Sequence, residues 1–118
     1  MPELKEMLEE LRGHKALGSV LLARDGTIIS SDMPVETNVE TFAIMMATIV
    51  GATFTAAKEL RQMPPKVVIA VSDDTKILLH NTGGKVFIAV VLPRSVEDRQ
   101  ILLKTEEILK EWDVQRRV

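Results

Sequence analysis

The longest apolar pattern in the chain lies between Thr37 and Met63. From Thr41 to Ala57 this segment carries no charged residue. Thr37 and Glu40 have the spacing of a capping box, in which each side chain bonds a backbone N–H of the other residue, so we expect a helix to start here. Pro64-Pro65 follow the segment and cannot continue a helix. The pattern therefore predicts one helix of about seven turns.

The two sides of this predicted helix differ when positions are placed at about 100° per residue. The bulky side is expected to pack on a sheet and carries Phe42, Met46, Ile49, Val50, Thr53 and Leu60. The opposite, smooth side carries Ile44, Ala47, Thr48, Gly51, Ala52 and Thr55. A helix that is apolar all round is expected to be buried all round. A chain of 118 residues is too short to enclose one, so we expect a second molecule to cover the smooth side.

Two other interpretations of this segment stay open. The uncharged run of 17 residues is at the lower limit for a membrane-spanning helix, which needs about 17–25 residues. It contains four threonines, and predicted strands follow it closely. The segment could also be an ordinary surface helix, because alanine tolerates exposure, although Ile44 on the smooth side argues against this. We expect no direct insertion into a membrane.

Five shorter apolar runs predict strands, and turn residues separate them. The runs are Gly18–Arg24, Thr27–Ser31, Lys66–Ser72, Lys76–Thr82 and Lys85–Leu92. Asp25-Gly26 predicts a two-residue hairpin, and Asp73-Asp74 and Gly83-Gly84 mark two more turns. Connections this short join antiparallel neighbours. Val67–Val71 and Val86–Leu92 are apolar without alternation, which indicates cover on both faces of the sheet and a helix, sheet, helix arrangement.

Two amphipathic helices are expected at the ends of the chain. The first covers Glu3–Arg12, with Pro2 at its start and Gly13 at its end. The last is capped by Ser95 or Asp98 and runs to Trp112, with a frayed tail at Arg116-Arg117. The predicted order is helix, two strands, long helix, three strands, helix. We expect one domain over residues 1–118.

Composition excludes some classes of protein. The net charge is −2 and 46% of the residues are hydrophobic, so the chain is expected to be globular, with no general attraction to nucleic acid. It has no cysteine, which excludes disulfides and thiolate chemistry and fits a cytoplasmic location. The N-terminal segment is acidic and lacks the pattern of a signal peptide.

One loop, Thr82–Lys85, superficially resembles a phosphate-binding loop because it reads TGGK. That motif needs a glycine five residues before its second glycine and a hydroxyl residue after the lysine. Those positions are Leu79 and Val86 here. A hairpin turn explains the loop better, and we expect no tight binding of nucleotide.

Other chemistry-bearing residues lack the neighbours that a site needs. Asp73-Asp74 has no nearby carboxylate or histidine to complete a metal shell. His80 and Ser30-Ser31 form no nucleophile–base pattern, and His14 is expected in a solvated loop. We therefore predict no catalytic, metal or cofactor site.

The order of the elements resembles the roadblock family, which contains dynein light chains and regulators of Ras-like GTPases. Three features carry the resemblance: GSVLLARDGTIISS, then the long small-residue helix ending KELRQMPPKVVIAVSD, then TKILLHNTGGKVFIAVVL with a closing helix. They cover about residues 3 to 112. Each is degenerate, so the specificity lies in their order and lengths. Profilin-like, longin and sensor folds share similar elements.

The resemblance implies an α/β (α+β) profilin-like fold with a five-stranded antiparallel sheet between helices. It also implies a homodimer whose long helices pack antiparallel and whose Lys66–Ser72 strands pair into one sheet. The implied interface consists of Ile44, Ala47, Thr48, Gly51, Ala52, Thr55, Val67, Ile69 and Val71. An antiparallel partner would bring its Glu40 toward Lys58.

The function implied by the resemblance is a non-enzymatic module that regulates or scaffolds a small Ras-like GTPase. Glu40, Lys58, Glu59 and Gln62, at the ends of the long helix, are the residues we expect to bind that partner. Arg24, Arg61, Arg94 and Arg99 have no context that favours an arginine finger. A dynein-light-chain-type adaptor and a small-ligand sensor stay open as alternatives; a sensor needs a hollow lined by polar groups.

Overall fold

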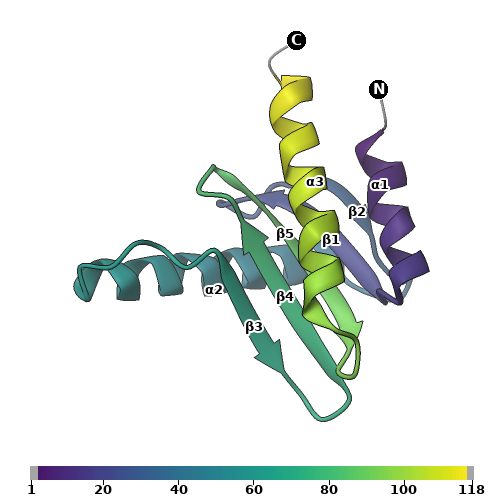
Figure 1. The fold of residues 1–118 in the computed structure, drawn as a ribbon, viewed down its shortest axis with the longest axis horizontal. Helices are drawn as coiled ribbons and strands as arrows, with labels where there is room; N and C mark the ends of the chain where they lie inside the picture. The colour runs from purple at the N-terminus through teal and green to yellow at the C-terminus, as the bar shows by residue number, and fades with distance from the viewer. Residues whose placement is uncertain (1–2, 117–118) are drawn as a thin grey trace.

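The computed structural model describes residues 3–116, and the predicted order of elements is confirmed (Figure 1). The helical elements are α1 (Leu4–Glu10), the 3-10 helix η1 (Leu11–His14), α2 (Val39–Glu59) and α3 (Asp98–Arg116). The strands are β1 (Gly18–Ala23), β2 (Ile28–Asp32), β3 (Val67–Val71), β4 (Thr75–Asn81) and β5 (Val86–Pro93). Pro2 and Arg117 lie outside the described residues, whereas Arg116 belongs to α3 and not to a tail as predicted.

The five strands form one antiparallel sheet in the order β2-β1-β5-β4-β3. The last strand in the chain, β5, lies at the centre between β1 and β4. The five-stranded antiparallel sheet expected from the resemblance is therefore confirmed. The two edge strands are β2, from the first hairpin, and β3, which follows α2 directly.

Each face of the sheet is covered by helices, and each layer has its own core. On one face α1 and α3 pack on alternate residues of the strands, among them Leu21, Leu78 and Ile88. On the other face α2 packs on the intervening residues, among them Leu22, Leu79 and Phe87. Figure 1 shows α1 and α3 side by side in front of the sheet and α2 crossing behind it. The predicted helix, sheet, helix arrangement is confirmed.

The first hairpin is one residue longer than predicted. The N–H of Ala23 donates to the carbonyl of Thr27, so the loop contains Arg24, Asp25 and Gly26. Gly26 has φ of +94°, which glycine adopts without strain. The backbone N–H of Thr27 donates to the Asp25 carboxylate at 2.9 Å. This bond, with a contribution from the Thr27 hydroxyl, lowers the pKa of Asp25.

The long helix is shorter at both ends than the sequence indicated. Its N-cap is Asn38, whose side-chain oxygen accepts a hydrogen bond from the N–H of Thr41 at 3.0 Å, so the capping box predicted at Thr37 is not formed. At the other end Arg61 has φ of +54°, and the N–H of Gln62 donates to the carbonyl of Ala57. This is a Schellman motif. It ends α2 before Pro64-Pro65, and the helix has 21 residues.

The two terminal helices are joined to the sheet by charged contacts. Lys76 of β4 is buried, and its ammonium lies 2.5 Å from the carboxylate of Asp98, the first residue of α3. The same ammonium donates to the carbonyl of Val96. At the N-terminal side, η1 ends at His14 and its C-cap Lys15 has φ of +75°, whereas the helix end was predicted at Gly13. The contacts of Lys76 hold the start of α3 against β4.

Candidate interaction surface

The C-terminal half of α2 extends beyond the sheet, and the outer side of the helix is uncovered. Figure 1 shows this half projecting past β3. Ile44 is 52% exposed, and Thr48, Ala52 and Thr55 are exposed along the same side. Only 17% of the most apolar stretch of α2 is buried within the chain. The predicted smooth side is therefore an apolar surface that one copy of the chain leaves open.

Some predicted positions on α2 lie elsewhere. Ala47 belongs to the core cluster beneath the helix and not to the open side. Leu60, predicted to face the sheet, is 72% exposed because it follows the last helical residue where α2 has already left the sheet. Met45 is exposed beside Ile44 and was missed, because its wheel position lies between the two sides.

Gly51 lies near the middle of the open side. A Cβ added at this position would meet no atom within 4 Å, so the glycine is not required for packing within the chain. Glycine inside a helix costs about 1 kcal/mol relative to alanine. Packing within the chain therefore does not explain why a glycine stands at this position.

The edge strand β3 is the second uncovered region. Ile69 is 41% exposed and Val71 is 58% exposed. The prediction that Val67–Val71 is covered on both faces is wrong for the single chain. The reason is the sheet order: α3 packs over β4 and β5, and on the edge strand its layer reaches Val67 but leaves Ile69 and Val71 exposed.

The opposite edge strand, β2, is held by the N-terminal elements. The Lys5 ammonium donates to the carbonyl of Ser31. The Arg12 guanidinium lies 2.7 Å from the Asp32 carboxylate. Of the two edges of the sheet, β3 is therefore the one that these contacts leave accessible.

The open residues of α2 and β3 lie on opposite sides of the sheet. Val67, Ile69 and Val71 alternate with Val68, which packs in the α2 layer, and Val67 packs in the α3 layer. Ile69 is paired with Leu78 of the α3 layer. A partner that contacts both regions must therefore reach around the β3 edge.

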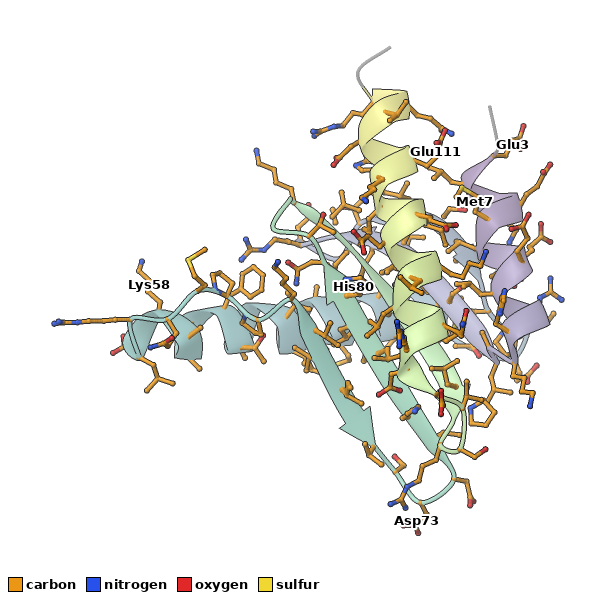
Figure 2. All side chains as sticks on the ribbon, in the orientation of Figure 1. Glu3, Met7, Lys58, Asp73, His80 and Glu111 are labelled. Atoms are coloured by element: carbon orange, nitrogen blue, oxygen red, sulfur yellow. The ribbon has the colours of Figure 1, made fainter. Side chains whose placement is uncertain are left out.

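The polar residues predicted to bind a partner are exposed but do not form one cluster. Glu40 lies in the first turn of α2, whereas Lys58 and Glu59 lie in its last turn and Gln62 follows it. Figure 2 shows Lys58 at the projecting end of the helix, far from Asp73 and His80. Glu40 is 18 residues from Lys58, or about 27 Å along the helix.

The residues considered for catalysis or metal binding remain separate. Within residues 3–116 no group of three or more His, Asp or Glu side chains could hold a metal ion. His80 is buried, and its Nδ1 lies 2.7 Å from the hydroxyl of Thr105, which itself donates to the carbonyl of Leu102. His80 is therefore a hydrogen-bonded core residue. Burial lowers its pKa, and the Glu106 carboxylate partly opposes this shift.

The arginines also stay apart. The guanidinium of Arg24 stacks on the ring of Phe54, 4.2 Å from its centroid. Arg61 ends α2, and Arg94 and Arg99 are exposed near the start of α3.

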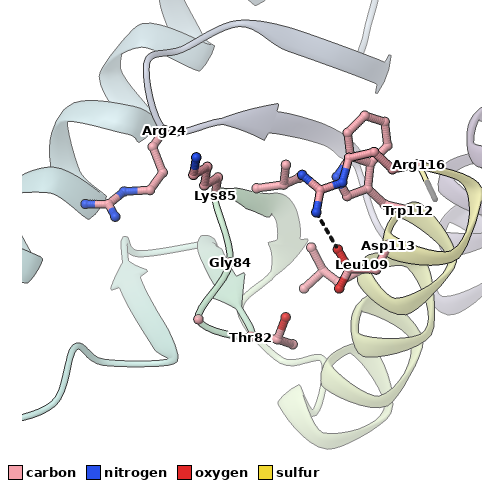
Figure 3. A pocket seen from close by; sticks show the side chains of 10 residues that line it. Arg24, Thr82, Gly84, Lys85, Leu109, Trp112, Asp113 and Arg116 are labelled. Atoms are coloured by element: carbon pink, nitrogen blue, oxygen red, sulfur yellow. Dashed lines mark ion pairs between the residues drawn. The ribbon is translucent and has the colours of Figure 1, made fainter.

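The structure also contains one feature that the sequence did not indicate, a cavity between α3 and the β4–β5 turn (Figure 3).

Comparison with solved structures shows which fold this is. No family model matches the sequence, and no curated protein matches it. A Roadblock/LC7 domain from Streptomyces avermitilis superposes with a TM-score of 0.88, covering 99% of this chain and 100% of that one at 15% identity. The chain has the roadblock fold. The predicted resemblance is therefore confirmed at the level of the fold.

Two further structures have a similar fold. MglB from Myxococcus xanthus has a TM-score of 0.84 at 15% identity and covers 94% of this chain and 95% of that one. Profilin II from Acanthamoeba castellanii is less similar, with a TM-score of 0.65 at 9% identity, and covers 96% of this chain and 98% of that one. The profilin-like arrangement that was expected is confirmed.

Proposed function

We propose that the protein is a non-enzymatic homodimeric module that regulates or scaffolds a small Ras-like GTPase. The observation that carries the proposal is the pair of uncovered regions, the outer side of α2 and the β3 edge, in a chain with the roadblock fold. The GTPase part rests on the resemblance to that family. Similar structures include MglB and, in a separate structure, MglB in a tetrameric arrangement.

A second copy of the chain is the partner that fits both regions. If two β3 strands pair antiparallel, the partner's sheet continues this one in the same plane, so its residues lie on both sides of the edge. Ile69 and Val71 then meet their counterparts on the α3 side. On the other side the projecting half of α2 extends over the partner's sheet. One contact thus covers surfaces that lie on opposite faces.

Antiparallel packing of the two α2 helices also matches their charges. The midpoint between Glu40 and Lys58 is Ile49, which lies within one turn of Gly51. A two-fold axis that passes the helix near Ile49 brings the Glu40 of one copy beside the Lys58 of the other. The flat surface at Gly51 allows the helices to approach closely where they cross.

The apolar character of α2 has a membrane interpretation that fits less well. By length and composition α2 could cross a membrane. However, Ala43, Met46 and Val50 of the same helix pack on the sheet, and the next strand begins at Val67. These contacts tie α2 to its own sheet, which supports a protein partner over a lipid one, and we propose a cytoplasmic location.

The proposed partner surface is the helix pair, with Lys58, Glu59 and Gln62 at its ends. GTPase switch loops are ordered when the γ-phosphate holds them. A surface that contacts those loops therefore binds the two nucleotide states with different affinity. Positioning of the GTPase's own residues is the proposed mode of regulation.

The experiment is a pull-down of the host's Ras-like GTPases, loaded separately with GDP or a non-hydrolysable GTP analogue. The double variant Lys58→Glu/Glu59→Lys keeps the net charge and should weaken retention. The matched control Lys104→Glu/Glu107→Lys reverses an exposed ion pair on α3 and should not. Light scattering during size exclusion should show a dimer for all three proteins, because an exposed ion pair such as Lys58 with the Glu40 of the other copy contributes only about 0–1 kcal/mol.

Three outcomes separate the parts of the proposal. If no Ras-like GTPase is retained in either state, the GTPase role fails and an adaptor or sensor role takes its place. Equal retention of both states supports scaffolding and contradicts control of the switch. A wild-type monomer at micromolar concentration would contradict the dimer.

A further inference from the structure

The cavity in Figure 3 lies at the end of the sheet where α3 passes the β4–β5 turn. Its volume is about 540 Å³, which is in the range of sites for small molecules, about 300–1,000 Å³. Val86, Leu109 and Trp112 supply its apolar wall, and Thr82, Gly84 and Lys85 lie on the turn opposite. Its apolar wall is on the α3 side of the sheet, whereas Arg24 and Lys85 also border a hollow beside Gly51 of α2.

Positive charge around this cavity exceeds negative charge. Lys85, Arg116 and Arg24 border it, and Asp113 is the one carboxylate that does so among the described lining residues. Asp113 lies 4.0 Å from the Arg116 guanidinium. Within residues 3–116 the Lys85 ammonium has no ion pair. Arg24 lies at the far rim with its guanidinium against Phe54, so Lys85 and Arg116 are the cations available to a ligand.

Several hydrogen-bonding groups at the cavity also lack partners. The indole Nε1 of Trp112 is buried and has no hydrogen-bond partner among the described residues. Across residues 3–116, neither the Thr82 hydroxyl nor the Gly84 N–H donates a hydrogen bond. The turn keeps this shape because the Gly83 N–H bonds the Asn81 side chain at 3.0 Å and Gly83 has φ of +93°. Thr82 and Gly84 are exposed on the turn, so their donors are open to a ligand in the cavity, whereas the indole Nε1 has almost no accessible surface and does not reach it.

We propose that this cavity binds a small organic anion, with a carboxylate or phosphate head and a flat apolar body. Lys85 and Arg116 hold the head, because an ionised acceptor forms the stronger hydrogen bonds with cationic donors. The Gly84 N–H and Thr82 hydroxyl supply further donors on the turn. The body packs on Leu109 and the ring of Trp112. Two cations, Lys85 and Arg116, are available at the cavity, so the site fits one anionic group better than a triphosphate.

The test uses the full chain and two simple probes, phenyl phosphate and benzoate, which share the flat body and differ in the head. Trp112 is the one tryptophan in the sequence. Its fluorescence and its indole N–H resonance therefore report on this cavity alone. Each probe should give a saturable change in both signals and should shift the Gly84 amide resonance. The probe that binds more tightly identifies the head.

Charge variants are expected to change the affinity for the probes in both directions. Lys85→Glu and Arg116→Glu should each weaken binding about tenfold or more, the range for a lost hydrogen bond to a charged group. Asp113→Asn should tighten it, because a repelling carboxylate is removed. The control Arg99→Glu makes the same charge change at the other end of α3 and should leave affinity unchanged.

Four results would overturn the proposal. The first is no saturable change with either probe at millimolar concentration. The second is equal binding of phenol that Lys85→Glu does not affect, since the cavity would then be an apolar hollow. The third is equal binding of inorganic phosphate, since the apolar body would then contribute nothing. The fourth is an equal loss of affinity in Arg99→Glu, which would show attraction by net charge alone.

Discussion

The strands β5 and β3 have nearly the same kind of sequence and different surroundings. Val86–Leu92 and Val67–Val71 are both apolar without alternation. In β5, Phe87 and Ala89 pack under α2, while Ile88 and Val90 pack under α1 and α3, so both faces are buried. In β3, Ile69 and Val71 are exposed. The comparison shows that an apolar run does not by itself tell whether a strand is covered within its own chain; in the proposed dimer a second copy would cover β3.

The largest expected effect comes from truncating the strand that is covered within the chain. Phe87 is 1% exposed and contacts the α2 layer. Phe87→Ala should lower the free energy of unfolding by about 3–5 kcal/mol, through lost burial and the cavity left behind. Urea denaturation followed by circular dichroism measures this. A loss below about 1 kcal/mol would mean that β5 is not the centre of the core.

The second-largest effect should be a weaker dimer with no loss in the stability of the folded chain. Gly51→Leu adds bulk where the chain itself offers open space. Overpacking a helix contact costs about 1–3 kcal/mol, so light scattering should show more monomer. The fold should be as stable as before or slightly more so. Gly13→Leu, at another glycine with open space, is the control and should stay dimeric.

A third test introduces a lysine on the edge strand β3, where it should oppose pairing with another strand. Lysine on an edge strand discourages pairing with another strand. Ile69→Lys should weaken the dimer by about 1 kcal/mol per copy through lost apolar burial. It should change the unfolding of the monomer by less than about 0.5 kcal/mol. If Ile69→Lys lowers the free energy of unfolding of the monomer as much as Phe87→Ala does, then β3 is as important to the folded monomer as β5, and the proposed difference between the two strands is wrong.

The smallest effect concerns His80, on the strand between β5 and β3. Burial lowers its pKa in the folded chain, so below about pH 6.5 the unfolded chain binds more protons. Stability should therefore fall as the pH drops from about 6.5 toward the folded pKa of this histidine. His80→Asn should flatten this part of the pH profile in thermal unfolding. An unchanged slope would assign the acid sensitivity to other groups.

The groups that face His80 come from α3 and from the segment before β3. Thr105 and Glu106 lie on α3, and Lys66 precedes β3, the neighbour of β4. Glu106 favours the protonated form and Lys66 disfavours it, and the burial effect is larger than either. Because burial is the largest cause of the lowered pKa of His80, the pH response comes mainly from desolvation of the added charge.

The order of elements could be predicted because it rests on local patterns. Alternation of apolar runs with Asp-Gly and Gly-Gly turns specified the strands, and their short connections specified antiparallel pairing. The end of α2 could not be predicted, because the residue type of Arg61 does not indicate a left-handed backbone conformation. The exposure of Ile69 could not be predicted either, since it depends on where α3 stops across the sheet.

Candidate sites were predictable only where they lie on one element. The open side of α2 followed from helical spacing, apart from Ala47, whose burial depends on how the helix is rotated on the sheet. The cavity beside Trp112 combines the end of α3 with a turn about thirty residues earlier. No spacing rule links those segments, so only the folded chain reveals it.

The contacts of Lys5 and Arg12 with β2 have a consequence for how far assembly by this sheet can proceed. A sheet whose two edges are both open can add copies at each edge, which is a route to aggregation. Here Lys5 bonds the carbonyl of Ser31 on the β2 edge, and Arg12 pairs with the Asp32 side chain beside it. Two copies that pair through β3 use each other's free edge, and the pair then offers none. Growth by strand addition would stop at two, so the short helix α1 would serve as a terminator of polymerisation.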